Sequence, residues 1–290
     1  MLLALTAALS IGYQLLRADD RARCVGAGRA DYKLRQESRW RFGSDDSQSF
    51  TITEVDDATP DSGIGGTIWE TSIALSCLLA GRKTLVGALE IGGTVGLCET
   101  GSAGGPASHG IGSEIDCATG LGRTLEIGAG VGLVGHAVSA LGTATVLTDV
   151  RAGLVENLAA SLQQFSNAKA ATLDWKDDGF PGLPQYDTII GADIIYYWPD
   201  IAPVVSTIDR LLAPGGTCYI SAPKHRSDGI AQDLASALRK VDFDVDQRKY
   251  VLVSEFLGGD LAAYEAGLAL HDPDEPYGTG EHSVFVVTRG

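Results

Sequence analysis

The fold of this chain is decided by one stretch of sequence, Thr124-Leu125-Glu126-Ile127-Gly128-Ala129-Gly130-Val131-Gly132-Leu133. An apolar strand leads into an acidic residue, and glycines follow at every second position. We expect the chain to turn sharply here and to enter a helix over residues 133–140. Glycines permit such a turn and let a ligand approach the backbone, while the helix N-terminus offers free N–H groups. Residues 126–132, the glycine loop, are therefore predicted to bind a cofactor.

The loop alone leaves two cofactors open. The spacing Glu126-x-Gly128-x-Gly130-x-Gly132 resembles the first motif of class I S-adenosylmethionine methyltransferases. The spacing Gly130-x-Gly132-x-x-Gly135 also satisfies the dinucleotide fingerprint. Asp149 follows the expected strand 145–148. Its spacing from the glycine loop along the sequence suits an acidic residue that binds ribose hydroxyls, whichever cofactor is bound.

Composition narrows the class of partner. The chain has 290 residues and a formal net charge of −15, which argues against a nucleic-acid partner and suits a basic protein. The cysteines are scattered and none forms a Cys-x-x-Cys pair, which predicts neither a metal site nor a disulfide framework. We expect free thiols in a reducing compartment. The expected compartment is the cytoplasm, with the nucleus as an additional location. The cysteines are Cys24, Cys77, Cys98, Cys117 and Cys218.

The first 41 residues differ from the rest. They carry eight Lys/Arg and four Asp/Glu in an otherwise acidic chain, so we expect a basic and apolar segment over 1–41 before a domain over 42–290. Residues 1–16 are apolar and uncharged, short for a membrane span and without the basic region of a secretory signal. A docking helix is the preferred interpretation, and organelle targeting by residues 1–18 is the alternative.

A strand and a helix are expected before the glycine loop. Residues 50–53 alternate apolar and polar side chains, as a half-buried strand does. Thr67-Ile68-Trp69-Glu70 has the form of a capping box, and an apolar face then continues to Gly81. Trp69 is accordingly predicted in the first turn of this helix.

Residues 89–97 nearly repeat residues 125–133, with seven of nine positions identical. The first copy has Thr94 where the second has its central glycine, and a Gly/Ser-rich stretch follows it instead of a helix. We predict that only the second copy binds a cofactor. Residues 84–122 are interpreted as an insertion that forms a loose, dispensable loop, from a local duplication or a retained intron.

Strands and helices alternate after the glycine loop. Such alternation predicts a parallel sheet covered on both faces, with ligands at the carboxyl ends of its strands. Helices are expected over 152–165, 201–212 and 228–241. Strands are expected over 170–173, 188–192, 217–222, 243–253 and 283–288.

Three side chains at expected strand ends carry the remaining chemistry. Trp175 follows the third strand, where an aromatic ring suits an adenine. Asp193 ends the fourth strand and faces the predicted cofactor site, and Tyr196 lies three residues further on the same edge. A nicotinamide-dependent oxidoreductase would leave all three without a role.

Four ordered motifs resemble one family, the seven-strand protein-lysine methyltransferases of methyltransferase family 16, or METTL21-like enzymes. The motifs are Thr67-Ile68-Trp69-Glu70, Leu125-Glu126-Ile127-Gly128-Ala129-Gly130, Leu173-Asp174-Trp175 and Ala192-Asp193-Ile194-Ile195-Tyr196. The last matches the D-x-x-Y signature of that family. The resemblance runs from about Trp40 to Gly290 apart from the insertion, and it implies a Rossmann-like α/β class I methyltransferase sheet of seven strands with helices on both faces.

The resemblance also implies the site and the partners. Asp193 and Tyr196 would face the incoming lysine of a protein substrate. Apart from the resemblance, we expect a monomer, with no nucleic acid because of the acidic charge and no metal because of the cysteine spacing. Small-molecule N- or O-methyl transfer, NAD-dependent oxidation and a non-catalytic binding module stay as alternatives. The residues implied to bind S-adenosylmethionine are Trp69, Glu126, Gly128, Ala129, Gly130, Asp149, Trp175 and Ala192.

Overall fold

The structure is a computed structural model that describes residues 36–42, 45–55, 63–66, 68–79, 85–88, 93–99, 120–177, 183–223, 229–254 and 281–289. The expectations for residues 1–35 and for the Thr67 capping box lie outside the described residues. No helix within the described ranges is long and apolar enough to span a membrane.

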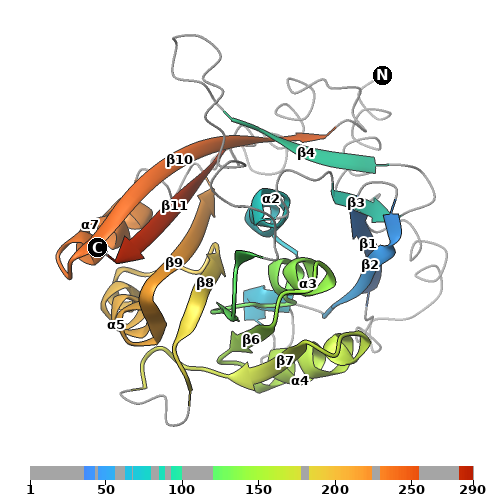
Figure 1. Cartoon of the computed structure of the whole chain (residues 1–290), viewed down its shortest axis with the longest axis horizontal. Coiled ribbons are helices and arrows are strands. Elements are labelled where there is room, and N and C mark those ends of the chain that lie inside the picture. Colours follow the sequence, from blue (N-terminus) through green and yellow to red (C-terminus); the bar gives the residue numbers. More distant parts are fainter. Residues whose placement is uncertain are drawn as a thin grey trace.

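Seven strands form the predicted doubly wound sheet, in the order β7-β6-β5-β8-β9-β11-β10 (Figure 1). Neighbours from β7 to β9 pair in parallel, and β11 is antiparallel to both β9 and β10. The order reverses beside β5, so the carboxyl ends of β5 and β8 flank the place where such folds bind ligands. The bounds are β5 Thr124–Glu126, β6 Thr145–Asp149, β7 Ala168–Thr172, β8 Tyr186–Ala192, β9 Leu212–Pro223, β10 Phe243–Ser254 and β11 Glu281–Arg289.

Helices cover both faces of this sheet, as predicted. On one face α2 (Glu70–Leu79) and α3 (Leu133–Ala140) bury their apolar side chains in a common core. On the other face α5 (Ile201–Leu211) and α7 (Ile230–Arg239) pack in a second core. The helix α4 (Ala152–Ser161) follows β6 and continues as a short 3₁₀ turn, Leu162–Gln164.

Four further strands extend the sheet beyond β10 in the order β4-β3-β1-β2 and curve around α2 and α3 (Figure 1). The edge strand β2 is fastened to the 3₁₀ turn after α4, because the Gln164 amide donates to the Thr51 carbonyl and accepts from the Thr51 N–H, both at 2.9 Å. The extension therefore reaches back to the opposite end of the sheet. Its bounds are β1 Gln36–Phe42, β2 Asp45–Glu54, β3 Leu85–Ala88 and β4 Gly93–Glu99.

The expectation of a loose loop over 84–122 is wrong for its described strands. β3 pairs with β1, and β4 pairs with both β3 and β10. Residues 93–97 of the first copy of the repeat lie in β4, because a glycine-interrupted apolar run without a following helix suits an extended strand. The boundary at residue 41 is also too late, since residues 36–41 of β1 already pair with the sheet.

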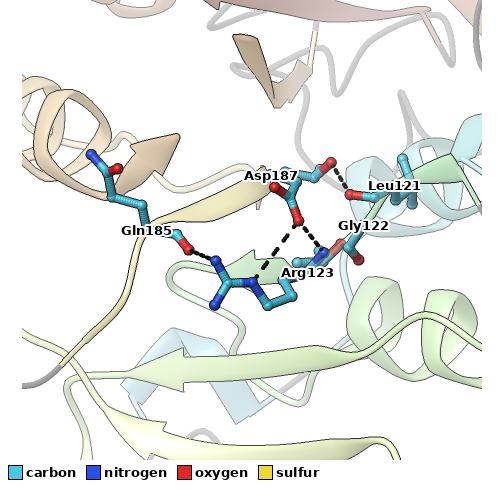
Figure 2. Close-up of polar contacts among 7 residues, drawn as sticks. Leu121, Gly122, Arg123, Gln185 and Asp187 are labelled. Carbon is cyan, nitrogen blue, oxygen red and sulfur yellow. Dashed lines mark hydrogen bonds and ion pairs between the residues drawn. The ribbon is translucent and has the colours of Figure 1, made fainter. Parts of the chain in front are cut away.

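The chain returns to the core through a fixed connection at residues 121–123 (Figure 2). The Arg123 backbone N–H donates to Asp187 Oδ2 at 2.7 Å, and its guanidinium donates to the Gln185 carbonyl at 2.8 Å. The Thr188 hydroxyl donates to the Leu121 carbonyl at 2.6 Å, and Leu121 is buried. The predicted insertion therefore ends before Leu121, and these bonds fix the start of β5 against β8.

Deleting residues 84–122 is expected to destabilise the protein, because the deletion removes two paired strands and the buried Leu121. We expect the melting temperature to fall by about 4 °C or more, since ~1 kcal/mol already shifts a domain by a few degrees. Replacing residues 101–118 with a Gly/Ser linker of equal length is the matched control. Equal melting temperatures for the deletion and the wild type would restore the original expectation.

Candidate active site

The glycine loop has the predicted strand–turn–helix form. Gly128, Gly130 and Gly132 have φ angles of 62°, 57° and 80°, in the left-handed region that a side chain disfavours. The Ala129 N–H donates to the Thr148 carbonyl at 2.8 Å, which fixes the loop to the end of β6. The helix α3 begins directly after Gly132, so its first N–H groups lie at the carboxyl edge of the sheet.

Protein atoms pack closely against the loop. A Cβ atom on Gly130 would lie 2.7 Å from the Gly65 carbonyl oxygen, and one on Gly128 would lie 2.9 Å from Ile194 and 3.3 Å from Trp175. Sequence reasoning expects a side chain at Gly130 to occupy the space of the ligand. In the structure such a side chain meets the 3₁₀ turn Gly63–Gly66.

Glu126 lies buried behind the glycine loop. Its Oε2 accepts the Gly135 N–H at 2.9 Å, within the first turn of α3. Burial raises the pKa of the Glu126 carboxyl to about 8, with the Gly135 bond acting to lower it and the nearby Asp149 charge acting to raise it. Glu126 therefore holds strand, loop and helix together, and its expected contact with the cofactor stays a prediction.

The buried Glu126 carboxyl predicts a pH-dependent stability. The folded pKa of about 8 lies above the ordinary 4.5. The stabilising contribution of the protonated Glu126 carboxyl to the free energy of unfolding is therefore complete below pH 4.5 and is lost as the pH rises to 8. The loss is on the order of 3–5 kcal/mol. In Glu126→Gln, which keeps an acceptor for Gly135, this term is absent.

Urea unfolding of the wild type and Glu126→Gln between pH 5 and 9 measures this difference. We expect the variant to gain stability relative to the wild type as the pH rises. A constant difference across the range would show that Glu126 is ionised in the folded protein.

Asp149 ends β6 beside the glycine loop, as predicted. Its Oδ2 accepts the Gly130 N–H at 3.0 Å and its Oδ1 accepts the Arg151 N–H at 3.1 Å. Each oxygen retains a lone pair, since a carboxylate accepts about four hydrogen bonds. The residue is 8% exposed, so a ribose diol would meet an oriented carboxylate that already fixes the loop.

Replacing Asp149 with Ala is expected to weaken S-adenosylmethionine binding by tenfold or more. A hydrogen bond to a charged group contributes about 1.5–3 kcal/mol, and the variant also releases the Gly130 N–H. Calorimetric titration gives the dissociation constant, with circular dichroism as a check on folding. A folded variant of unchanged affinity would remove Asp149 from the site.

Trp69 lies immediately before α2, whereas the capping box predicts it within the first turn. Its carbonyl accepts the Ser72 N–H at 3.0 Å. The Ser221 hydroxyl donates to the Thr71 carbonyl at 3.2 Å and so joins α2 to β9. Gly65 thus lies against the glycine loop and Thr71 against β9 near its carboxyl end, and Trp69 is half-buried.

Asp193 and Tyr196 lie on the same edge. Asp193 follows β8, is 4% exposed and has a φ of 54°, and its N–H donates to the Ser221 carbonyl at 2.8 Å. A buried aspartate with left-handed backbone is strained, and such strain concentrates at functional sites. Ala192 and Tyr196 on either side of it are half-buried.

Trp175 connects the cofactor side to this edge. The half-buried ring reaches to within contact of Gly128, and the next residue, Lys176, pairs with Asp200 at 2.7 Å. Asp200 raises the pKa of Lys176 through this hydrogen bond. The loop after β7 and the turn before α5 are thereby joined across the site.

His136 is a part of the site that sequence reasoning missed. Its Nδ1–H donates to the Gly132 carbonyl at 2.7 Å, and its Nε2 lies 2.9 Å from the Ser161 hydroxyl. Burial lowers the pKa of His136 to about 4, so the ring is neutral. A lone histidine one turn after Gly132 in an apolar helix is the signal that indicates this brace between the loop and α4.

The described residues fit an adenosyl cofactor. Three left-handed glycines lead into the N-terminus of α3, Asp149 presents an oriented carboxylate, and Trp175 supplies an aromatic ring beside Gly128. Their predicted contacts with the cofactor, and those of Trp69, Ala129 and Ala192, stay predictions. What the structure establishes is that these residues meet at one edge of the sheet.

Comparison with known proteins gives the chemistry of the relatives. Residues 45–232 match a family model described as lysine methyltransferase. A mouse protein named EEF1A lysine methyltransferase 3 is 31% identical over 112 residues, 37% of this chain and 47% of its own length. The zebrafish protein N-lysine methyltransferase METTL21A is 31% identical over 96 residues, 31% of this chain and 44% of its own. The chain spans about half the length of the curated relatives that it matches.

Solved structures are more distant in sequence. The N-methyltransferase NodS from Bradyrhizobium japonicum, in complex with S-adenosyl-L-homocysteine, is 12% identical with a TM-score of 0.42, over 58% of this chain and 78% of its own.

Proposed function

The chain belongs to the lysine methyltransferase family, and we propose that it transfers a methyl group from S-adenosylmethionine to a lysine side chain of a protein substrate. The observation that carries this proposal is the position of Asp193, buried and left-handed at the end of β8. It follows the strand that pairs with β5, from which the glycine loop leaves. A cofactor on the loop and an amine at Asp193 would therefore meet.

The chemistry asks the protein mainly to position two reactants. When bound, the cofactor supplies an activated methyl group on its sulfonium. The attacking lysine must be neutral, although its ordinary pKa is about 10.4. The Asp193 carboxylate favours the ammonium form, so its role is to bind and orient the arriving amine, with proton loss to water. Tyr196, three residues further along, limits the directions from which the amine arrives.

The acceptor is a protein in this proposal. The acidic chain suits a basic partner surface, and the family relatives carry protein-lysine names. We further propose that the enzyme acts as a monomer in the cytoplasm. The location rests on the scattered cysteines of the sequence, of which Cys218 is a free and buried thiol.

The test is a labelling experiment with radioactive S-adenosylmethionine. The full chain is incubated with a cell lysate freed of small molecules, and separately with the metabolite extract from the same cells. We expect label in one or a few protein bands. Label confined to the metabolite extract would replace the protein acceptor with a small molecule, and tight binding of NAD instead of S-adenosylmethionine would remove methyl transfer altogether.

A further inference from the structure

Two aromatic side chains are exposed directly beyond the Asp193–Tyr196 edge. Tyr197 is 69% exposed and Trp198 is 62% exposed, the two highest values among the large apolar side chains of the described residues. The core of the protein does not use these exposed rings. Tyr197 is in extended conformation, and Trp198 begins the 3₁₀ turn that precedes α5. Adjacent exposed aromatic residues of this size are typical of binding surfaces.

Trp198 is held in its exposed position. Its indole N–H donates to Asp233 Oδ2 at 2.7 Å, in the first turn of α7. The turn itself is fixed by the Asp200–Lys176 ion pair, so ring and backbone are both held from neighbouring elements. A side chain that is ordered before binding loses less conformational entropy when a partner arrives.

The charge beside the ring selects the partner. Lys176 balances the charge of Asp200. Among the described residues no Lys or Arg forms an ion pair with Asp233, so its carboxylate charge is not balanced in this way. A cation above the Trp198 ring would therefore gain both the attraction of the aromatic face and that of the Asp233 carboxylate. An acidic residue would be repelled at the same place.

The distance suits a residue near the methylated lysine. Tyr197 and Trp198 follow Asp193 by four and five residues, which limits their separation from it to roughly 14–18 Å of extended chain. An extended peptide covers about 3.3 Å per residue, so residues within five positions of a lysine at Asp193 reach the pair.

We propose that Tyr197, Trp198 and Asp233 form a docking surface for a Lys or Arg side chain that neighbours the acceptor lysine in the substrate. This inference rests on the proposed function and names a determinant of substrate choice for it. The surface recognises a basic segment of a protein, and the proposed methyl transfer at Asp193 is separate from it.

Direct binding of short peptides tests this surface without requiring turnover. The probe is a fluorescein-labelled peptide with one central Lys flanked by Arg on both sides, compared with the same peptide carrying Glu in place of Arg. Fluorescence anisotropy is measured with S-adenosylhomocysteine present. We expect the Arg peptide to bind more tightly, with an affinity roughly fivefold lower in Trp198→Ala and in Tyr197→Ala.

Two further variants separate charge and folding from surface contact. Asp233→Asn keeps an acceptor for the indole and removes the charge, so we expect about a threefold loss for the Arg peptide alone. Val241→Ala alters another exposed apolar residue. Val241 lies before the start of β10, at the amino ends of the parallel strands and away from Asp193, so peptide affinity should not change.

Three outcomes would overturn the inference: no saturable binding of the Arg peptide to the wild type, equal affinity in all variants, or a preference for the Glu peptide. Sedimentation of the wild type and Trp198→Ala tests whether a second copy of the chain occupies the surface instead. A wild-type dimer that dissociates in the variant would assign Tyr197 and Trp198 to a dimer interface. Failure of the lysate labelling with an intact peptide result would refute the proposed function alone.

Discussion

Replacing Gly130 with Val is expected to abolish measurable binding of S-adenosylmethionine. The left-handed φ of 57° costs a residue with a side chain about 1–2 kcal/mol. The new Cβ would also lie 2.7 Å from the Gly65 carbonyl oxygen, so either the loop or the turn Gly63–Gly66 must move. Movement of the loop would displace the N–H that Asp149 now accepts. We expect a loss of roughly 100-fold or more, about 2.7 kcal/mol, in calorimetric titrations.

Two matched controls identify the cause of that loss. Gly142→Val introduces the same left-handed strain, at a φ of 94°, where a Cβ would meet nothing within 4 Å. Gly93→Val alters the first copy of the repeat, within β4, where a β-branched residue suits the strand. Both should bind the cofactor normally. Loss of binding in Gly93→Val with binding retained in Gly130→Val would assign the cofactor to the other copy.

Replacing Asp193 with Asn is expected to lower methyl transfer by roughly 100-fold, because misplacing one reactant by about 1 Å has an effect of that size. Asn is the informative substitution, since it tolerates left-handed backbone, preserves the shape and removes the charge that holds the amine. Cofactor affinity should remain, because Asp193 acts on the acceptor side. Initial rates on the labelled protein band and calorimetric titration together measure the two effects.

The control for this substitution lies on the same strand. Asp187→Asn alters an exposed aspartate at the other end of β8, where it fixes Arg123. It should leave the transfer rate near that of the wild type. A rate near the wild type in Asp193→Asn as well would show that the carboxylate does not orient the substrate.

The central sheet follows from the sequence because its periodicity is strong. In four segments the spacing of the apolar residues determines both the type of element and the face that is buried. They are the strand–loop–helix at 124–140, the buried run at 188–192 and the helices α5 and α7. The glycine spacing also predicts the loop conformation, since the structure needs left-handed backbone at three alternate positions. The family expectation from four ordered motifs is confirmed by the match over residues 45–232.

The remaining features depend on contacts between distant segments. β3 and β4 become strands by pairing with β1 and β10, and the composition of residues 84–99 gives no sign of those partners. The position of Glu126 behind the loop requires α3 to place its Gly135 N–H there. The brace at His136 likewise needs Ser161 of α4 within reach. Such pairings are tertiary contacts, which the local pattern of a single sequence does not predict.

Identification of the methylated atom tests the central claim most directly. The protein band labelled by the full chain is digested, and the modified peptides are sequenced by mass spectrometry with S-adenosylmethionine carrying a deuterated methyl group. We predict the deuterated methyl on lysine Nζ, at roughly 100-fold lower abundance when Asp193→Asn replaces the wild type under initial-rate conditions. The label on arginine, on a carboxylate or on no protein at all would contradict lysine methylation by this site.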